Sequence, residues 1–165
     1  MPLTSFASIP DDARVWVFAS DRPLSVEQAT PMLAEVDAYL SQWKAHGQPL
    51  RCAREWTDDR FLVIGIDPTE EQASGCSIDA LFRHLREVEQ AAGTRLVGGG
   101  RVFYRDVRGD IHCVTPAEFE ARAERGEVTP RTTVFDTSIT VARDWRTRFA
   151  RPASESWTAD LLAAS

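Results

Sequence analysis

Phe61-Leu62-Val63-Ile64-Gly65-Ile66 is the stretch that decides the fold, because no polar residue interrupts it. A strand with one face in solvent alternates apolar and polar residues, whereas a strand buried on both faces does not. Arg14-Val15-Trp16-Val17-Phe18-Ala19 also lacks that alternation after its first residue. Both segments are therefore predicted to be central strands of one sheet.

An amphipathic helix is predicted after each of these strands. The helix after Ile66 has apolar residues at helical spacing from Ile78 to Val88 and is expected to end near Gly93. The helix after Ala19 is expected to end near Gly47, and its apolar stripe consists of Met32, Leu33, Val36, Leu40 and Trp43. Packing against the sheet explains both stripes.

Two other predicted strands have mixed faces. One covers residues 50–57, and the other runs from Val102 to Val107 and forms a hairpin with Ile111–Val114. The resulting order, β-α-β-β-α-β, is that of the ferredoxin-like unit, in which the first and third strands are central. We therefore predict an α+β, ferredoxin-like core with its helices on one face of an antiparallel sheet.

The extra strand of the hairpin, a short helix and a C-terminal tail follow the β-α-β-β-α-β unit. Thr115-Pro116-Ala117-Glu118 is a strong helix start, and that helix is predicted to end near Gly126. We expect residues 1–165 to form a single domain. Its core would span about 13–126, with the tail, about 137–165, packing on it.

The overall composition narrows the partners and the compartment. The 165 residues carry a formal net charge of −6, whereas proteins that bind nucleic acids or anionic membranes usually show a basic face. No apolar run approaches the ~20 residues of a membrane span, and Met1 to Pro10 lacks a signal pattern. We expect a cytoplasmic protein that binds neither nucleic acid nor membrane.

The sequence contains no motif for a metal or a cofactor. Its three cysteines, Cys52, Cys76 and Cys113, are widely spaced and form neither a disulfide framework nor a metal-binding pair. His84 and His112 have no partners at metal-ligand spacing, and no Walker motif occurs. We therefore predict no metal and no cofactor.

Ser74-Gly75-Cys76-Ser77-Ile78-Asp79 is the best candidate for chemistry. It follows the Phe61–Ile66 strand and opens the next helix, so Cys76 is predicted to lie in the first helical turn. A thiol there is close to the positive end of the helix dipole and to unpaired backbone N–H groups, and both favour the thiolate. The same N–H groups could instead bind an anion.

The predicted topology brings distant segments to the sheet edge where this helix begins. His46, Arg14 and Tyr104-Arg105-Asp106 are all expected at that edge. The candidate catalytic residues are Cys76 as nucleophile or redox thiol, His46 as its base and Asp79 as an orienting group. The candidate ligand-binding residues are Ser74, Gly75, Ser77, Arg14 and Arg105.

Most of these residues also have a simpler explanation. Cys76 could be a small buried residue that closes the turn, and His46 could be an exposed residue that ends a helix. Asp79 could act only on the helix dipole, and Ser74 and Ser77 could act only as caps. The sequence leaves both interpretations open.

Several segments together resemble a family of short bacterial proteins that often carry a transporter-ATPase label. The most specific are Ala45-His46-Gly47-Gln48-Pro49-Leu50 and Ser74 to Asp79, and the likeness extends to Arg14–Trp16, Phe61–Ile64 and Tyr104–Asp106. The ATPase label finds no support in this chain, because it has neither Walker motif. The resemblance implies a bacterial cytosolic origin and assigns no catalytic residue.

Two functions from different classes fit these observations. In the first, the chain is a cytosolic enzyme that acts on a small molecule through Cys76 at the sheet edge. In the second, it is a non-catalytic module that binds a small anion or a partner protein, or forms a homodimer through its sheet face. The sequence does not decide between them, so it leaves open whether the chain is an enzyme.

Overall fold

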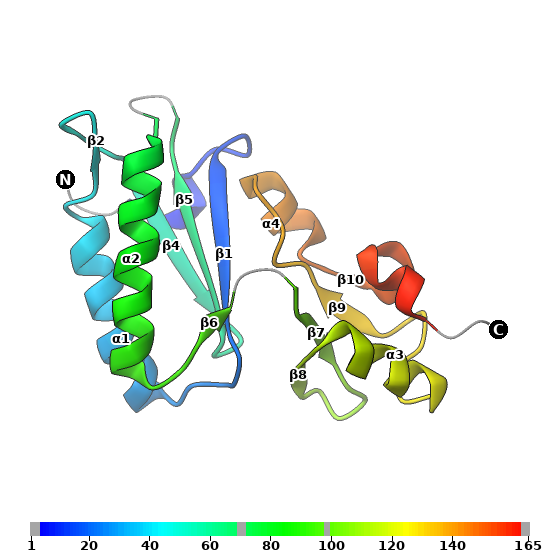
Figure 1. Ribbon diagram of the computed structural model, residues 1–165. Helices are drawn as coiled ribbons and strands as arrows, with labels where there is room; N and C mark the ends of the chain where they lie inside the picture. Colours follow the sequence, from blue (N-terminus) through cyan, green and yellow to red (C-terminus); the bar gives the residue numbers. More distant parts are fainter. Residues whose placement is uncertain (1–3, 69–71, 98–99, 163–165) are drawn as a thin grey trace.

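Two four-stranded antiparallel sheets, one small hairpin and the helices packed on them form an α+β structure (Figure 1). The computed structural model describes residues 4–68, 72–97 and 100–162. The helices of these residues are α1 (Val26–Leu40), α2 (Gly75–Ala92), α3 (Pro116–Glu124) and α4 (Ala142–Arg148), with the 3-10 helices η1 (Phe6–Ser8), η2 (Ala153–Glu155) and η3 (Trp157–Leu161). The strands are β1 (Arg14–Ser20), β2 (Lys44–Ala45), β3 (Gln48–Pro49), β4 (Cys52–Thr57), β5 (Phe61–Ile66), β6 (Leu96–Val97), β7 (Val102–Arg105), β8 (Ile111–Val114), β9 (Thr133–Phe135) and β10 (Ala150–Pro152).

The first sheet has the strand order β4-β5-β1-β6, and every neighbouring pair is antiparallel. The prediction that β5 and β1 are its central strands is confirmed. All six residues of β5 are buried. Arg14 lies opposite Ile66 and Ala19 lies opposite Phe61, so the two strands pair along the whole of β5.

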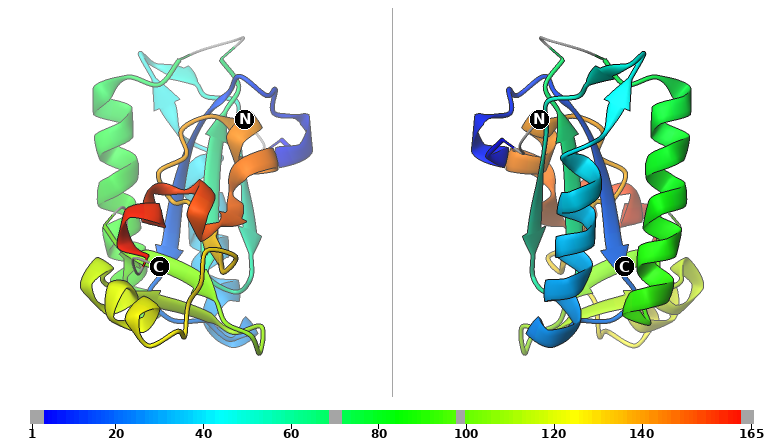
Figure 2. Two further views of the ribbon diagram at one scale, coloured as in Figure 1. Left: turned by 90° about the vertical axis from the view of Figure 1, so that its right-hand side faces the viewer. Right: turned by 90° about the vertical axis from the view of Figure 1, so that its left-hand side faces the viewer.

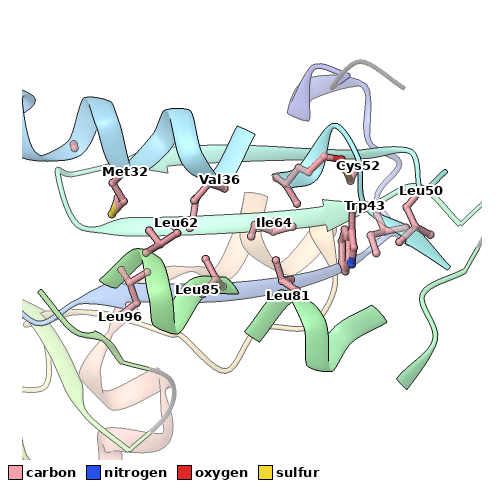
Figure 3. Packing of buried hydrophobic residues seen from close by; sticks show 14 of the residues in the cluster. Met32, Val36, Trp43, Leu50, Cys52, Leu62, Ile64, Leu81, Leu85 and Leu96 are labelled. Atoms are coloured by element: carbon pink, nitrogen blue, oxygen red, sulfur yellow. Dashed lines mark hydrogen bonds between the residues drawn. The ribbon is translucent and has the colours of Figure 1, made fainter. Parts of the chain in front are cut away.

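Helices α1 and α2 cover one face of this sheet (Figures 1 and 2). Alternate residues of β5, Leu62 and Ile64, pack in one cluster with the apolar faces of both helices (Figure 3). The helical members of that cluster include Met32, Val36, Leu81 and Leu85. Among the described residues, none of the helices combines the length and apolarity that a membrane crossing requires.

The opposite face carries a second apolar cluster, which joins the first sheet to the second. Phe61 of β5 points to this side. Its ring centroid lies 5.4 Å from that of Phe103, 5.1 Å from that of Phe135 and 5.0 Å from that of Phe149. Phe103 belongs to β7 and Phe135 to β9, so a single residue of the first sheet touches two strands of the second.

The predicted fourth strand of the first sheet is wrong. Val102–Arg105 (β7) belongs to the second sheet, whose order is β10-β9-β7-β8. The position beside β1 is taken by β6, which pairs through Ala19–Val97 and Ser20–Leu96. A two-residue strand has no periodicity that a sequence can show, whereas β7 is a longer run. The predicted pairing of β7 with β8 is confirmed.

Part of the C-terminal segment packs on the first sheet, on the face away from α1 and α2 (Figure 2). Ala142 and Trp145 of α4 belong to the cluster that covers the rear of β1 and β5. An antiparallel bridge between Arg14 and Val141 fixes the start of α4 against the first residue of β1. Residues far apart in the sequence therefore share one apolar core.

Phe61→Ala is expected to lower the free energy of unfolding by about 3–5 kcal/mol, because it deletes a fully buried ring that touches both sheets. Chemical denaturation followed by tryptophan fluorescence measures the change. Val107→Ala, at a fully exposed position, is the control and should change it by less than ~0.5 kcal/mol. A loss below ~1 kcal/mol for Phe61→Ala would show that the sheets do not depend on this ring.

Candidate functional site

The first turn of α2 is closed by a reciprocal cap. The Ser77 amide donates to Ser74 Oγ over 3.1 Å, and the Ser74 amide donates to Ser77 Oγ over 2.8 Å. Ser77 Oγ also donates to the Ser74 carbonyl oxygen over 2.8 Å. Both serines were predicted to bind a ligand, but the helix itself uses both hydroxyls.

Gly75 and Cys76 occupy the first two positions of α2, ahead of the capped Ser77. The N–H groups of these positions have no acceptor inside the helix. A Cβ atom built on Gly75 would meet no atom of residues 4–68, 72–97 or 100–162 within 4 Å, so none of these residues crowds the helix start. Cys76 is a free, exposed cysteine, which contradicts its alternative interpretation as a buried packing residue.

The other two thiols lie in very different surroundings. Cys52 is buried between the first sheet and α1, where its thiol donates to the Leu40 carbonyl oxygen over 3.3 Å. Burial raises the pKa of Cys52 to about 12. Cys113 is half-buried, and desolvation is the main cause that raises its pKa. Neither thiol combines exposure with a helix start.

The hairpin of β2 and β3 lies beside the start of α2. Trp43, just ahead of β2, donates its indole N–H to the Ser77 carbonyl oxygen over 2.9 Å, and β2 contacts α2. His46 and Gly47 form the tip of the hairpin with φ angles of 52° and 75°, as a tight two-residue turn requires. The predicted helix end near Gly47 is therefore wrong, because α1 ends at Leu40.

A row of ring contacts leads from Arg14 towards α2. The Arg14 guanidinium lies 4.7 Å from the ring centroid of Trp16, which in turn lies 6.0 Å from that of Trp43. Arg14 and Trp16 also line a hollow of about 140 Å³ with Gln72. Trp16 and Trp43 were not predicted to belong to this edge, because their spacing only indicated a strand and a helix stripe.

The candidate catalytic side chains at this edge have no polar partner among the described residues. Within residues 4–68, 72–97 and 100–162, no hydrogen bond or ion pair engages the side chain of Cys76, His46 or Asp79. All three side chains are exposed. The structure thus brings the start of α2, the His46 hairpin and Arg14 to one edge of the sheet, without a preformed triad.

Arg105 lies elsewhere, contrary to the predicted gathering of site residues. Its guanidinium donates to the Gly109 carbonyl oxygen over 2.8 Å and pairs with Asp58 at 3.5 Å. Asp58 belongs to the turn that precedes β5, whereas α2 follows the far end of that strand. The length of β5, roughly 17 Å at ~3.4 Å per residue, separates these two ends. The wrong assignment of β7 to the first sheet explains the error.

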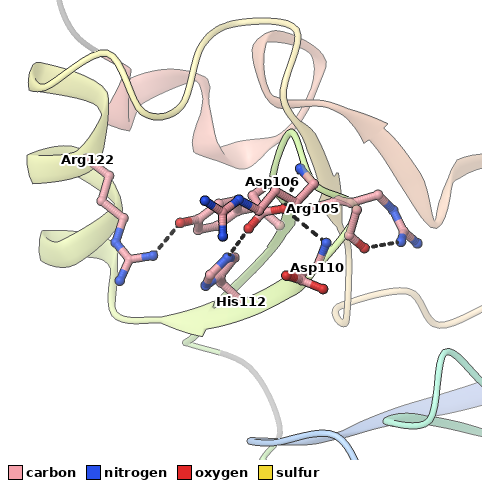
Figure 4. A network of polar contacts seen from close by, with 8 residues as sticks. Arg105, Asp106, Asp110, His112 and Arg122 are labelled. Atoms are coloured by element: carbon pink, nitrogen blue, oxygen red, sulfur yellow. Dashed lines mark hydrogen bonds and ion pairs between the residues drawn. The ribbon is translucent and has the colours of Figure 1, made fainter.

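The segment next to Arg105 forms a polar network on the second sheet (Figure 4). Asp106 Oδ1 accepts from the amides of Arg108 and Asp110 at 2.8 and 3.0 Å, and Asp106 Oδ2 bonds His112 Nε2 at 2.7 Å. The His112 ring stacks on Tyr104, whose hydroxyl accepts from Arg122. Asp106 therefore fixes the β7–β8 turn and holds its two strands together.

Comparison with known proteins finds no relative: no family model, curated protein or solved structure matches this chain. Within the part of the chain that the structure describes, no group of three or more His, Cys, Asp or Glu residues could hold a metal ion. The function must therefore be inferred from the side chains at the candidate site.

Asp106→Asn is expected to destabilise the protein at neutral pH and to have a smaller effect in acid. The hydrogen bond with His112 is the main cause that lowers the pKa of Asp106 below its ordinary value of 3.8. The stabilisation is therefore complete well above pH 3.8 and is lost as the pH falls below it. Urea unfolding of both proteins from pH 7 to pH 2.5 or below measures this. Asp110→Asn is the matched control, and an equal loss at every pH in Asp106→Asn would contradict the expectation.

Proposed function

We propose that this protein acts on a small molecule through the Cys76 thiol, used as a nucleophile or redox-active group where α2 begins. One observation carries the proposal: Cys76 is exposed at the start of an 18-residue helix, while Cys52 is buried and Cys113 is half-buried. A helix N-terminus attracts anions, and the thiolate is the reactive form of cysteine. The proposed setting, the bacterial cytosol, rests on the family resemblance.

The other residues of the edge have proposed roles that follow from their positions. His46, on the neighbouring hairpin, would accept the thiol proton once a substrate draws the two together, since catalytic hydrogen bonds often tighten only in the complex. Arg14, beside the hollow that it lines with Trp16, would bind an anionic group of the substrate. Asp79 would orient the imidazole.

We also propose that residues 14–97 form a ferredoxin-like unit whose four strands are β1, β4, β5 and β6. Support comes from the order β6-β1-β5-β4, which is 4-1-3-2 when these strands are numbered along the chain. Helix α1 lies between the first and second of them, and α2 between the third and fourth. The short hairpin of β2 and β3, inserted ahead of β4, would be an addition to that unit.

A second candidate function is a non-catalytic module that binds a small anion at the same edge. The observation in its favour is that neither Cys76 nor His46 has a polar partner among the described residues. Arg14 and the amides of Gly75 and Cys76 would then hold the ligand without covalent chemistry. The reactivity of the thiol separates the two candidates.

Cys76 is expected to react with iodoacetamide about tenfold faster in the folded protein than in the urea-unfolded chain, because only the fold places it at a helix start. Peptide mass spectrometry follows each cysteine separately. Cys113 should react more slowly than Cys76, and Cys52 should stay unmodified until unfolding, because burial raises its pKa to about 12.

Two variants assign the source of that reactivity. A drop in the Cys76 rate in His46→Ala would identify the imidazole as the base, and Asp79→Asn should then cause a smaller drop. Arg86→Ala, an exposed change further along α2, is the control. Equal rates for folded and unfolded Cys76, unaffected by these variants, would refute thiol catalysis and favour the binding module.

A further inference from the structure

A hollow of about 510 Å³ lies between the second sheet and the segments that follow it. Three arginines line it, and they come from separate parts of the chain: Arg101 precedes β7, Arg148 ends α4 and Arg151 lies in β10. Only the fold brings these residues together. Small-molecule sites in proteins commonly have volumes of ~300–1,000 Å³, so the hollow can hold a ligand of ordinary size.

The positive charge of this hollow is not neutralised by ion pairs. Within residues 4–68, 72–97 and 100–162, no hydrogen bond, ion pair or ring contact engages the side chains of Arg101, Arg148 or Arg151. Other arginines of the chain do pair with carboxylates, for example Arg54 with Asp37 at 2.7 Å. Three guanidinium groups around one hollow repel one another, and an anion between them would remove that repulsion.

The two carboxylates in the lining offset only part of this charge. Asp136 accepts from both the amide and the hydroxyl of Ser138, so its Oδ1 oxygen is already bonded. Glu155 is exposed and has no bonded partner among the described residues. The lining keeps an excess of one positive charge in a chain whose net charge is −6.

An exposed aromatic ring stands at the same hollow. Trp157 is the one tryptophan of the five that is exposed, at 47% of its surface, and it lines the hollow with the arginines. Its position is firmly held, because the next residue, Thr158, is fully buried and donates its hydroxyl to the Ala153 carbonyl oxygen. An exposed indole is a surface on which a planar ring can stack.

We propose that this hollow, the Arg–Trp hollow, binds a small phosphate ester that carries a planar ring, of the mononucleotide class. The guanidinium groups of Arg101, Arg148 and Arg151 hold the phosphate through forked, charge-assisted hydrogen bonds. Trp157 stacks on the ring. This site lies on the second sheet, so the proposal stands or falls independently of the Cys76 edge.

A ligand needs both a phosphate and a planar ring to use both features of the lining, the three arginines and Trp157. A free phosphate would use the arginines and leave Trp157 exposed. An uncharged planar molecule would use the indole and leave the three guanidinium groups unpaired. A long nucleic acid is disfavoured by the net charge of −6. A ligand with one phosphate and one ring satisfies the charge and the aromatic surface together.

Isothermal titration calorimetry of the full chain with AMP, inorganic phosphate and adenosine tests the proposal. AMP should bind more tightly than phosphate, and adenosine should bind at least about tenfold more weakly than AMP. Arg148→Gln and Arg151→Gln should each weaken AMP and phosphate by about tenfold. Arg148→Lys, which keeps the charge but loses the fork, should have a smaller effect.

Trp157→Ala separates the aromatic half of the site from the charged half. It should weaken AMP by about tenfold and leave phosphate binding unchanged. Arg86→Gln on α2 removes the same charge far from the hollow and should change neither affinity. AMP binding that is undetectable at millimolar concentration, or unchanged in both Arg148→Gln and Arg151→Gln, overturns the proposal. Equal affinities for AMP and phosphate, unaffected by Trp157→Ala, overturn the assignment of the ring.

Discussion

The burial of β5 on both faces is the constraint on which the rest of the structure depends. Leu62 packs under α1 and α2, and its neighbour Phe61 packs against the second sheet. A shift of one residue in strand pairing would exchange these two sets of side chains, so the register is strongly determined. Gly65 also favours this register, because its position is too crowded for a larger residue. A Cβ atom there would lie 3.2 Å from Phe6 and 3.3 Å from Val15.

The register of β5 also determines where the candidate site lies. The strand ends at Ile66, and the chain then enters α2 at the edge where β1 begins. The hydrogen bond from Trp43 to the Ser77 carbonyl oxygen connects the hairpin of β2 and β3 to that edge. Core packing thus places the Cys76 thiol and the His46 hairpin near each other, although neither side chain belongs to the core.

Local signals explain what could be predicted from the sequence. The central strands follow from runs without alternation, and the starts of α2 and α3 follow from capping residues, which form capping boxes at both helices. The errors concern pairings between distant or very short segments. Leu96–Val97 is too short to show a period, so the sequence favours the longer Val102–Arg105 run as the fourth strand, and this error also places Arg105 at the wrong edge.

The positions of the candidate functional side chains depend still more on tertiary structure. Cys52 and Cys76 are both single cysteines in ordinary sequence contexts, yet one is sealed beneath α1 while the other faces solvent. The difference is that other elements pack over Cys52 and none of the described elements buries Cys76. The residues next to each cysteine in the sequence do not show this difference. The same holds for Arg101 and Arg148, which line one hollow although 46 positions separate them in the sequence. The proposed ligand hollow therefore depends on unpaired charges and an exposed ring that the fold gathers, which no motif in the sequence indicates.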